Sequence, residues 1–237
     1  MRLLLIAALL PVTACHASWE KDGPSAHASG SGATRTYEAA GFTGVDLRGS
    51  DDVDVKAGNS FSVTAEGDPK VLDVIEIKVV DGTLRVGRKA NSVDFEDHGA
   101  KIHVVMPKLN LASVSGSGNL TIDRAEGDFV GSIAGSGNLD VAALNANAAK
   151  LSVAGSGDMT LAGTVGKLTA SIVGSGDIDG EKLTASGASI SIVGSGNLSG
   201  VVKGGASVSI AGSGDVDLKG GAQCAVNAVG SGEAHCS

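Results

Sequence analysis

The second half of the chain alternates apolar and small polar residues in short segments. Residues 111–115 and 130–134 follow this pattern, and shorter alternating segments lie at 120–122 and 139–141. Period-two alternation is typical of half-buried β-strands. No amphipathic stretch of helical length interrupts the pattern, so we predict an all-β fold.

A Gly-Ser-Gly corner followed by Asn, Asp or Glu separates the alternating segments. Seven such corners, spaced by about twenty residues, begin at Gly116, Gly135, Gly155, Gly174, Gly194, Gly212 and Gly230. A fixed period of this length marks a stacked repeat architecture. Two short strands cannot bury an apolar face alone, but neighbours stacked about 4.8 Å apart can. We therefore predict a β-solenoid, single-stranded and β-helix-like, with about 18–20 residues per coil.

The corner residues suit a tight turn that repeats along one edge. Glycine permits a bend with positive φ, and the Asn or Asp that follows can bond to nearby backbone. Stacking predicts a structural turn ladder of Asn119, Asn138, Asp158, Asp177, Asn197 and Asp215. Calcium β-rolls offer a comparison, but their period is nine, and half of these positions are uncharged Asn. We interpret the ladder as structural and expect no metal and no cofactor.

Residues 37–110 are rich in strand patterns but lack the regular repeat. Asp81-Gly82 lies between the alternating segments 75–80 and 83–86, as in a β-hairpin. Gly49-Ser50-Asp51-Asp52 resembles a degenerate first corner. We expect one domain over 37–237, with less regular coils at 37–110 and the repeats at 111–237.

Several segments of this first half, in this order, resemble the head GIN domain family of exported bacterial proteins. The matching segments are Val53-Asp54-Val55, Gly58-Asn59-Ser60-Phe61-Ser62-Val63, Asp81-Gly82-Thr83-Leu84-Arg85-Val86 and Met106-Pro107, followed by the seven corners. The resemblance covers about residues 38–233. It implies a β-helix-like solenoid and an adhesin-like protein of unassigned biochemistry.

The first fourteen residues have the layout of a signal peptide. Arg2 precedes an apolar run at 3–10, which is too short for a permanent membrane-spanning helix. Val12-Thr13-Ala14-Cys15 resembles the bacterial lipobox, in which the cysteine is lipidated and becomes the first mature residue. The alternative is an ordinary signal peptide followed by a coincidental cysteine. His16, where an inner-membrane retention signal would have Asp, favours an outer membrane lipoprotein that faces the periplasm or the surface.

Composition adds a tether and excludes one class of partner. Residues 15–36 are rich in Ser, Ala, Gly and His, so we expect a flexible lipidated tether. The formal net charge is −8, and no run of Lys or Arg forms a basic stripe. Nucleic acid binding requires phosphate neutralisation, so we expect no nucleic acid partner.

Two cysteines remain at the C-terminus once Cys15 is assigned to lipid. Cys224 and Cys236 in an exported protein favour a disulfide that closes the end of the solenoid. His235 beside Cys236 leaves a metal site as the alternative, but no CxxC spacing supports it.

Clustered catalytic groups are not evident in the sequence. The densest polar group is interpreted as a solvated loop before a strand, and it comprises Asp94, Glu96, Asp97, His98 and His103. We assign no catalytic residue and expect a non-enzymatic cell-envelope interaction or adhesion domain. Its partners would be the membrane, through the lipid, and an envelope polysaccharide, protein or matrix component. A carbohydrate-active β-helix enzyme and a structural envelope spacer are the alternatives.

Overall fold

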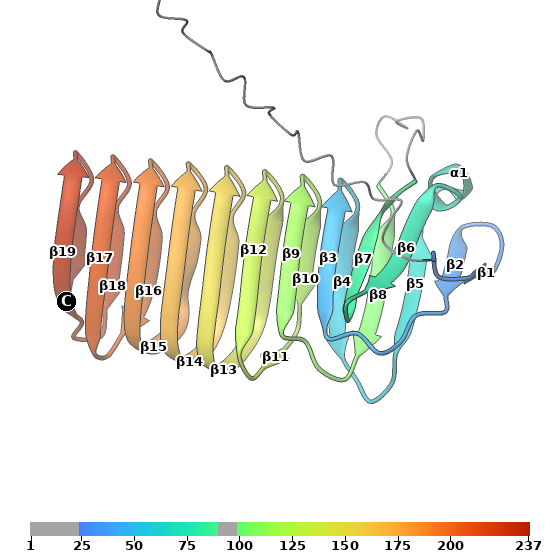
Figure 1. Ribbon diagram of the computed structural model, residues 1–237, viewed down its shortest axis with the longest axis horizontal. Helices are drawn as coiled ribbons and strands as arrows, with labels where there is room; N and C mark the ends of the chain where they lie inside the picture. Colours follow the sequence, from blue (N-terminus) through green and yellow to red (C-terminus); the bar gives the residue numbers. More distant parts are fainter. Residues whose placement is uncertain (1–23, 90–98) are drawn as a thin grey trace, which may run out of the picture.

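Strands make up most of the described part of the protein. The computed structural model describes residues 24–89 and 99–237, which form twenty strands and one short helix, α1 (Pro69–Leu72). The strands stack into an elongated solenoid (Figure 1). No helix in the described residues is long and apolar enough to cross a membrane. The strands are β1 (Ala28–Ser29), β2 (Thr34–Tyr37), β3 (Gly44–Gly49), β4 (Asp52–Ala57), β5 (Ser62–Glu66), β6 (Ile75–Val80), β7 (Thr83–Arg88), β8 (Lys101–Met106), β9 (Leu111–Gly116), β10 (Asn119–Ile122), β11 (Ala125–Glu126), β12 (Phe129–Gly135), β13 (Asn138–Gly155), β14 (Met159–Gly174), β15 (Ile178–Gly194), β16 (Leu198–Val202), β17 (Gly205–Gly212), β18 (Val216–Lys219), β19 (Gln223–Gly230) and β20 (Ala234–Cys236).

Each coil contributes one segment to each of two parallel sheets, which face each other across the core. The first sheet contains β3, β9, β12, the C-terminal parts of β13, β14 and β15, then β17 and β19. The second contains β4, β10, the N-terminal parts of β13, β14 and β15, then β16, β18 and β20. Corner pairs with corner, as Gly155 pairs with Gly174 and Gly174 with Gly194. The predicted solenoid is confirmed.

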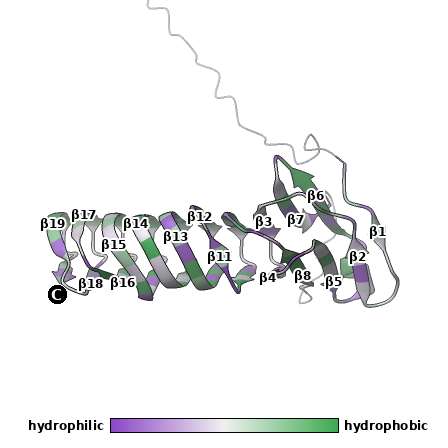
Figure 2. Ribbon diagram, turned by 90° about the horizontal axis from the view of Figure 1, so that it is seen from below, coloured by the Kyte–Doolittle hydropathy of each residue, from purple (hydrophilic) through white to green (hydrophobic). Residues whose placement is uncertain are grey.

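The core is a thin layer of branched side chains between the two sheets. Every second residue of each strand points inward, so stacked coils build continuous apolar rows. The two central inner rows are at most 2% exposed. They comprise Val114, Ile133, Val153, Ile172, Ile192, Ile210 and Leu120, Leu139, Met159, Ile178, Leu198, Val216. Hydrophobic and hydrophilic positions alternate visibly across the coils (Figure 2).

The first half of the body contributes both coils and antiparallel strands. β3 pairs in parallel with β7 and β9, and β4 with β8 and β10, which continues the two sheets. β6 then runs antiparallel to β7, and β5, β2 and β1 add antiparallel strands beyond β8. The turn between β6 and β7 has positive φ at Asp81 (49°) and Gly82 (73°), which confirms the predicted hairpin. Residues 37–110 therefore contain irregular coils, as expected. They also contain antiparallel strands, which cover the N-terminal end of the solenoid.

The predicted tether, residues 15–36, differs from the structure over its second part. Thr34–Tyr37 pairs with β5, Ala28–Ser29 pairs with β2, and Ser25 forms a bridge with Lys78. Tyr37 is buried and anchors this segment to the body. The antiparallel edge of β5 offers backbone partners that composition alone does not reveal. Cys15 and the predicted signal peptide lie outside the described residues.

The degenerate first corner, Gly49-Ser50-Asp51-Asp52, has the backbone geometry of the later corners but carries Asp in place of the second glycine. Gly49 pairs with Gly116 and has φ 124°, like the first glycine of the later corners. Asp51 occupies the place of the second glycine and is fully buried. Arg88 holds it through two bonds of 2.8 and 3.0 Å, and the Ala100 N–H donates to it at 2.8 Å. A side chain fits here because no earlier Gly-Ser-Gly corner stacks on that side.

Candidate functional site

The repeated corners are close-packed backbone turns. The carbonyl of Gly155 accepts N–H groups from Ser175 (2.9 Å) and Gly176 (3.1 Å) of the next coil, and at every other corner the serine N–H donates to the preceding corner in the same way. A Cβ at Gly176 would overlap the carbonyl oxygen of Gly157. Backbone therefore occupies the space that a phosphate or a metal ion would need inside the corner. The serine is exposed at the apex of each corner.

The ladder residues bond to one another along the edge of the second sheet. The Asp158 side chain accepts the Asp177 N–H at 2.9 Å, and the Asp177 side chain accepts the Asn197 N–H at 2.6 Å. Asn197 and Asp215 continue in the same way toward Glu233. From Asn138 to Asp215, each ladder side chain thus accepts a backbone N–H of the following corner, whereas Asn119 accepts the side-chain amide of Asn138. This is a structural use of Asn and Asp.

Further aspartates lie beside the ladder on the outer surface of the second sheet. Asp140, Asp179 and Asp217 stand two residues after ladder positions, so they point outward from the same face. With three ladder members they define the acidic face: Asp140, Asp158, Asp177, Asp179, Asp215 and Asp217. A shallow groove of about 440 Å³ runs over its C-terminal part. These aspartates are far apart in the sequence, and the strand register brings them onto one surface.

The outer surface of the first sheet is uncharged over most of its length. We define the serine face by its central row, Ser113, Ser132, Ser152, Ser171, Ser191 and Ser209, which pair in register from coil to coil. The flanking rows carry Thr, Ser, Ala and Val, including the half-exposed Val173 and Val193. From β9 to β17, Lys150 is the one charged residue in these three rows; on β3 the same rows carry Asp46 and Arg48. The period of about twenty residues, which aligns these serines, was the available signal in the sequence.

The remaining polar clusters do not form a closed site. In residues 24–89 and 99–237, no group of three or more His, Cys, Asp or Glu side chains is arranged to hold a metal ion. His103 lies on β8 with its Nδ1 3.5 Å from Asp54. The other members of the predicted polar group, Asp94, Glu96, Asp97 and His98, lie outside the described residues. A groove of about 480 Å³ lies where the repeats begin, with Lys108, Arg124 and Glu126 in its wall.

A disulfide joins the last two strands of the solenoid. Cys224 of β19 and Cys236 of β20 are bonded, with 6.4 Å between their Cα atoms. Both cysteines lie in inward-facing rows, in register with Ala206 and Leu218 of the preceding coil. The bond thus links the two sheets across the core at the C-terminal end, and these cysteines are unavailable to a metal.

This arrangement of coils, corners and antiparallel strands matches a known family. Residues 41–222 match the sequence family described as "Putative auto-transporter adhesin, head GIN domain". The chain belongs to this family. The head GIN domain thus spans the antiparallel first half and nearly all of the repeats, as the sequence resemblance implied. No curated protein matches the chain.

Solved structures share the fold of this head GIN domain. A putative adhesin from Bacteroides fragilis superposes with a TM-score of 0.78 at 21% identity, covering 86% of this chain and 96% of the other. A putative lipid binding protein from Parabacteroides distasonis gives 0.68 at 22% identity, with the same coverage. A putative adhesin from Parabacteroides merdae gives 0.67 at 19% identity, covering 86% and 95%. At these identities the likeness concerns the fold.

The two faces of the head GIN domain offer different chemistry. The serine face presents hydroxyls and methyl groups at the spacing of stacked strands, about 4.8 Å. The acidic face presents carboxylates in an open groove.

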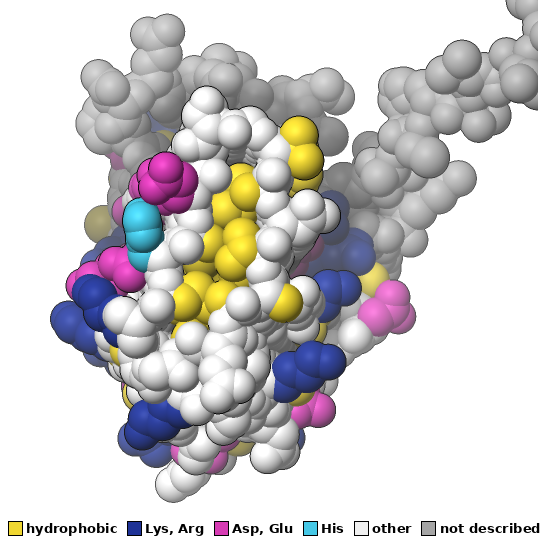
Figure 3. Space-filling view, turned by 90° about the vertical axis from the view of Figure 1, so that its left-hand side faces the viewer, with side chains coloured by type: hydrophobic (Ala, Val, Ile, Leu, Met, Phe, Trp, Pro, Cys, Tyr) yellow, Lys and Arg dark blue, Asp and Glu magenta, His cyan; other side chains and the backbone are white. Residues whose placement is uncertain are grey.

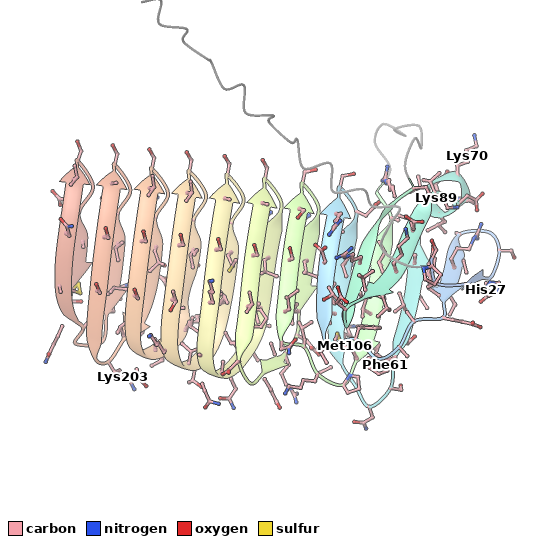
Figure 4. All side chains as sticks on the ribbon, in the orientation of Figure 1. His27, Phe61, Lys70, Lys89, Met106 and Lys203 are labelled. Atoms are coloured by element: carbon pink, nitrogen blue, oxygen red, sulfur yellow. A yellow bond between two sulfur atoms is a disulfide. The ribbon has the colours of Figure 1, made fainter. Side chains whose placement is uncertain are left out.

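Lys203 lies at the bend opposite the corners (Figure 4). Lys219 bonds to Glu181 at 3.1 Å, and this hydrogen bond raises the pKa of Lys219. Extended, regular surfaces of this kind suit repeated weak contacts with a polymer or another surface.

Proposed function

We propose that this protein is an exported, lipid-anchored component of the cell envelope whose solenoid acts as a non-enzymatic adhesion module. The serine face carries the proposal, because it presents the same groups on successive coils. Each contact with a repeating partner is weak, but several coils bind at once, and multivalent contacts add avidity. The adhesin-like family and the elongated body support this function. The partner class is an envelope polysaccharide or a matrix component.

The binding proposal is tested by placing charge on the serine face. Ser132→Arg combined with Ser171→Arg should weaken binding to immobilised cell-wall polysaccharide or matrix protein at least tenfold, since each bulky cation separates the partner from the hydroxyl row. The matched control, Thr121→Arg with Thr160→Arg, adds the same charge on the second sheet. Surface plasmon resonance with the exported chain gives both affinities. Equal loss in both variants, or binding unaffected by the serine-face pair, would contradict the proposal.

Anchoring through Cys15 is a separate part of the proposal. The lipobox-like segment 12–15 and the apolar run before it support lipidation, and no Asp at position 16 directs retention in the inner membrane. Cys15→Ser should abolish incorporation of radiolabelled fatty acid and move the protein to the soluble fraction. Cys224→Ser, which removes a cysteine elsewhere, should leave the lipid in place. A Cys15→Ser protein that still carries lipid would refute the anchor.

The acidic face gives a second candidate, a carbohydrate-active enzyme. Asp179 and Asp217 lie on one sheet surface, and Ser199 between them donates to Asp179 at 3.2 Å. Paired carboxylates perform acid–base work in glycosidases. The groove around them is open, and its aspartates are exposed. Release of reducing sugar from cell-wall polysaccharide, lost in Asp179→Asn, would favour this function over adhesion.

A further inference from the structure

The central row of the serine face continues into charged residues toward the first half of the body. Ser113 pairs in register with Asp46 of β3, and Asp46 pairs with Arg85 of β7. Side chains that pair in register on one surface of a sheet are neighbours, since the strands lie about 4.8 Å apart. The row of hydroxyl groups therefore leads to a carboxylate and a guanidinium.

A groove forms where the hairpin of β6 and β7 meets the serine face. The two strands rise from the line of the coils on the side of the first sheet (Figure 2). The groove has a volume of about 280 Å³, and the hairpin, β3, β9 and β12 all contribute to its wall. Its polar side chains are Asp46, Asp81, Thr83, Arg85, Ser113 and Ser132. Pockets for drug-sized ligands span about 300–1,000 Å³, so this groove suits one small unit.

The carboxylate of the groove is held in a fixed position. Asp46 is only 8% exposed, and its Oδ2 accepts the Arg48 Nε–H at 2.8 Å and lies 3.9 Å from Nε of Arg85. A ligand therefore does not have to order this group, which lowers the entropic cost of binding. Among the described residues at the groove, the formal charges of Asp46 and Asp81 balance those of Arg48 and Arg85. This balance favours a neutral ligand over an ion.

Two apolar side chains complete the groove. Leu111 and Val130 pair in register, and Val130 is 41% exposed. The end view shows hydrophobic side chains gathered between the two sheets (Figure 3), whereas Leu111 and Val130 lie on the outer surface of the first sheet. A small apolar surface beside a few directional polar groups is typical of a ligand pocket. A sugar ring has the matching chemistry, because it carries C–H groups on its faces and hydroxyl groups at its rim.

We propose that this groove binds one neutral sugar unit of a polysaccharide that lies along the serine face. Neighbouring hydroxyl groups of the sugar donate to the Asp46 carboxylate and accept from the Arg85 guanidinium, and its C–H groups pack on Val130. The inference rests on the proposed adhesion function, and it narrows the partner class to a neutral polysaccharide. The groove selects the sugar, and the serine face adds repeated contacts with the rest of the polymer.

Titration of the exported Cys15→Ser chain, which carries no lipid, followed by NMR, tests the groove. The probes are the methyl glycosides of glucose, galactose, mannose and N-acetylglucosamine. At least one of them should shift the amide resonances of Asp46, Ser113 and Ser132 at millimolar concentration and leave those of β17 unchanged. Methyl glucuronide and methyl glucosaminide, which carry a charge, should bind more weakly. The proposal is overturned if no neutral glycoside binds, if a charged one binds more tightly, or if the shifts spread evenly over the solenoid.

A substitution inside the groove and a matched one outside it locate the sugar. Val130→Arg should weaken binding of the glycoside about tenfold, because the long side chain enters the groove beside Leu111. Val173→Arg is the control: Val173 is 53% exposed on the same sheet surface two coils further along, so it should leave glycoside binding unchanged. Circular dichroism verifies that each variant is folded. Equal affinities of the two variants for the glycoside would contradict the site.

A second variant keeps the test decisive if Val130→Arg does not fold. Asp46→Asn retains the shape of the side chain and removes its charge, and hydrogen bonds to a charged group are the stronger ones. The glycoside should therefore bind about tenfold more weakly to this variant. Unchanged affinity in Asp46→Asn would overturn the proposal.

The polysaccharide itself separates this inference from the proposed adhesion function. Val173→Arg should weaken binding of the immobilised polymer, because Val173 belongs to the serine face, and should leave glycoside binding intact. Val130→Arg should weaken both. Polymer binding without any glycoside binding would overturn the sugar groove and leave adhesion in place. Glycoside binding by a chain that does not hold the polymer would refute adhesion and retain the groove.

Discussion

A methyl group added at Gly176 would meet the Gly157 carbonyl oxygen and the Val153 side chain of the preceding coil. The corner has no free space because backbone stacks on backbone. Gly176→Ala should therefore lower the free energy of unfolding by about 3 kcal/mol, which for a domain of this size lowers Tm by roughly 6–12 °C. Gly205→Ala is the control, since nothing lies within 4 Å of its added Cβ. Thermal melts of equal Tm for the two variants would contradict close packing at the corner.

At the residue scale, the burial of Tyr37 predicts how the free energy of unfolding depends on pH. Its hydroxyl is buried without a hydrogen-bond partner in the described structure, and burial raises the pKa of Tyr37 above 10.0. The unfolded chain then loses this proton at lower pH than the folded one, so stability should fall as pH rises above about 10. The chain has one tyrosine, so absorbance near 295 nm follows this group alone.

The matching substitution isolates the Tyr37 effect. Tyr37→Phe should remove this alkaline loss of stability and should be neutral or stabilising at pH 7, because it removes an unpaired buried hydroxyl. Urea melts at pH 7 and pH 11 give the difference. A tyrosine that titrates at or below 10 in the folded protein would contradict this account.

At the scale of a single element, the stability of the terminal coil, β19 and β20, depends on its disulfide. In the described residues, β19 pairs with β17 and β20 pairs with β18 of the preceding coil, and a loop of this length contributes about 3 kcal/mol when closed. Cys224→Ser with Cys236→Ser should open the last coil while the interior stays folded, because solenoid coils interact with nearest neighbours. Hydrogen exchange should therefore quicken in β19 and β20 and stay unchanged in β14. Uniform quickening would indicate that the solenoid unfolds as one unit.

The coils could be predicted from sequence more fully than the cap and the faces. Each corner repeats the same local constraint, so the strands between Gly135 and Gly174 are evident from alternation and spacing. The antiparallel pairing of Thr34–Tyr37 with β5 is a long-range contact, and no repeat in the sequence predicts it. The acidic face was missed for a related reason, since Asp140 and Asp179 come together only through the register of stacked coils.

The whole molecule behaves as a stack in which one coil can be removed. Deleting residues 156–174 joins Gly155 to Ser175 and restores a complete corner in register. The shortened protein should fold, with a slightly lower Tm and a shorter hydrodynamic length. Deleting residues 160–169 removes half a coil and would move the following strand to the wrong sheet. That variant should aggregate or unfold, as measured by circular dichroism and sedimentation velocity; equal folding of both deletions would contradict the register argument.

The sequence by itself determined the coil length, the corners and the inward and outward rows, because a repeat subjects each copy to the same nearest-neighbour packing. Local rules of alternation and glycine geometry were sufficient for that. Only the tertiary structure decided what happens where the repeat stops. The buried pair of Asp51 and Arg88 and the antiparallel strands at the N-terminal end depend on contacts between distant segments. At that end, antiparallel strands take the place of an earlier repeat, so no period in the sequence specifies the contacts.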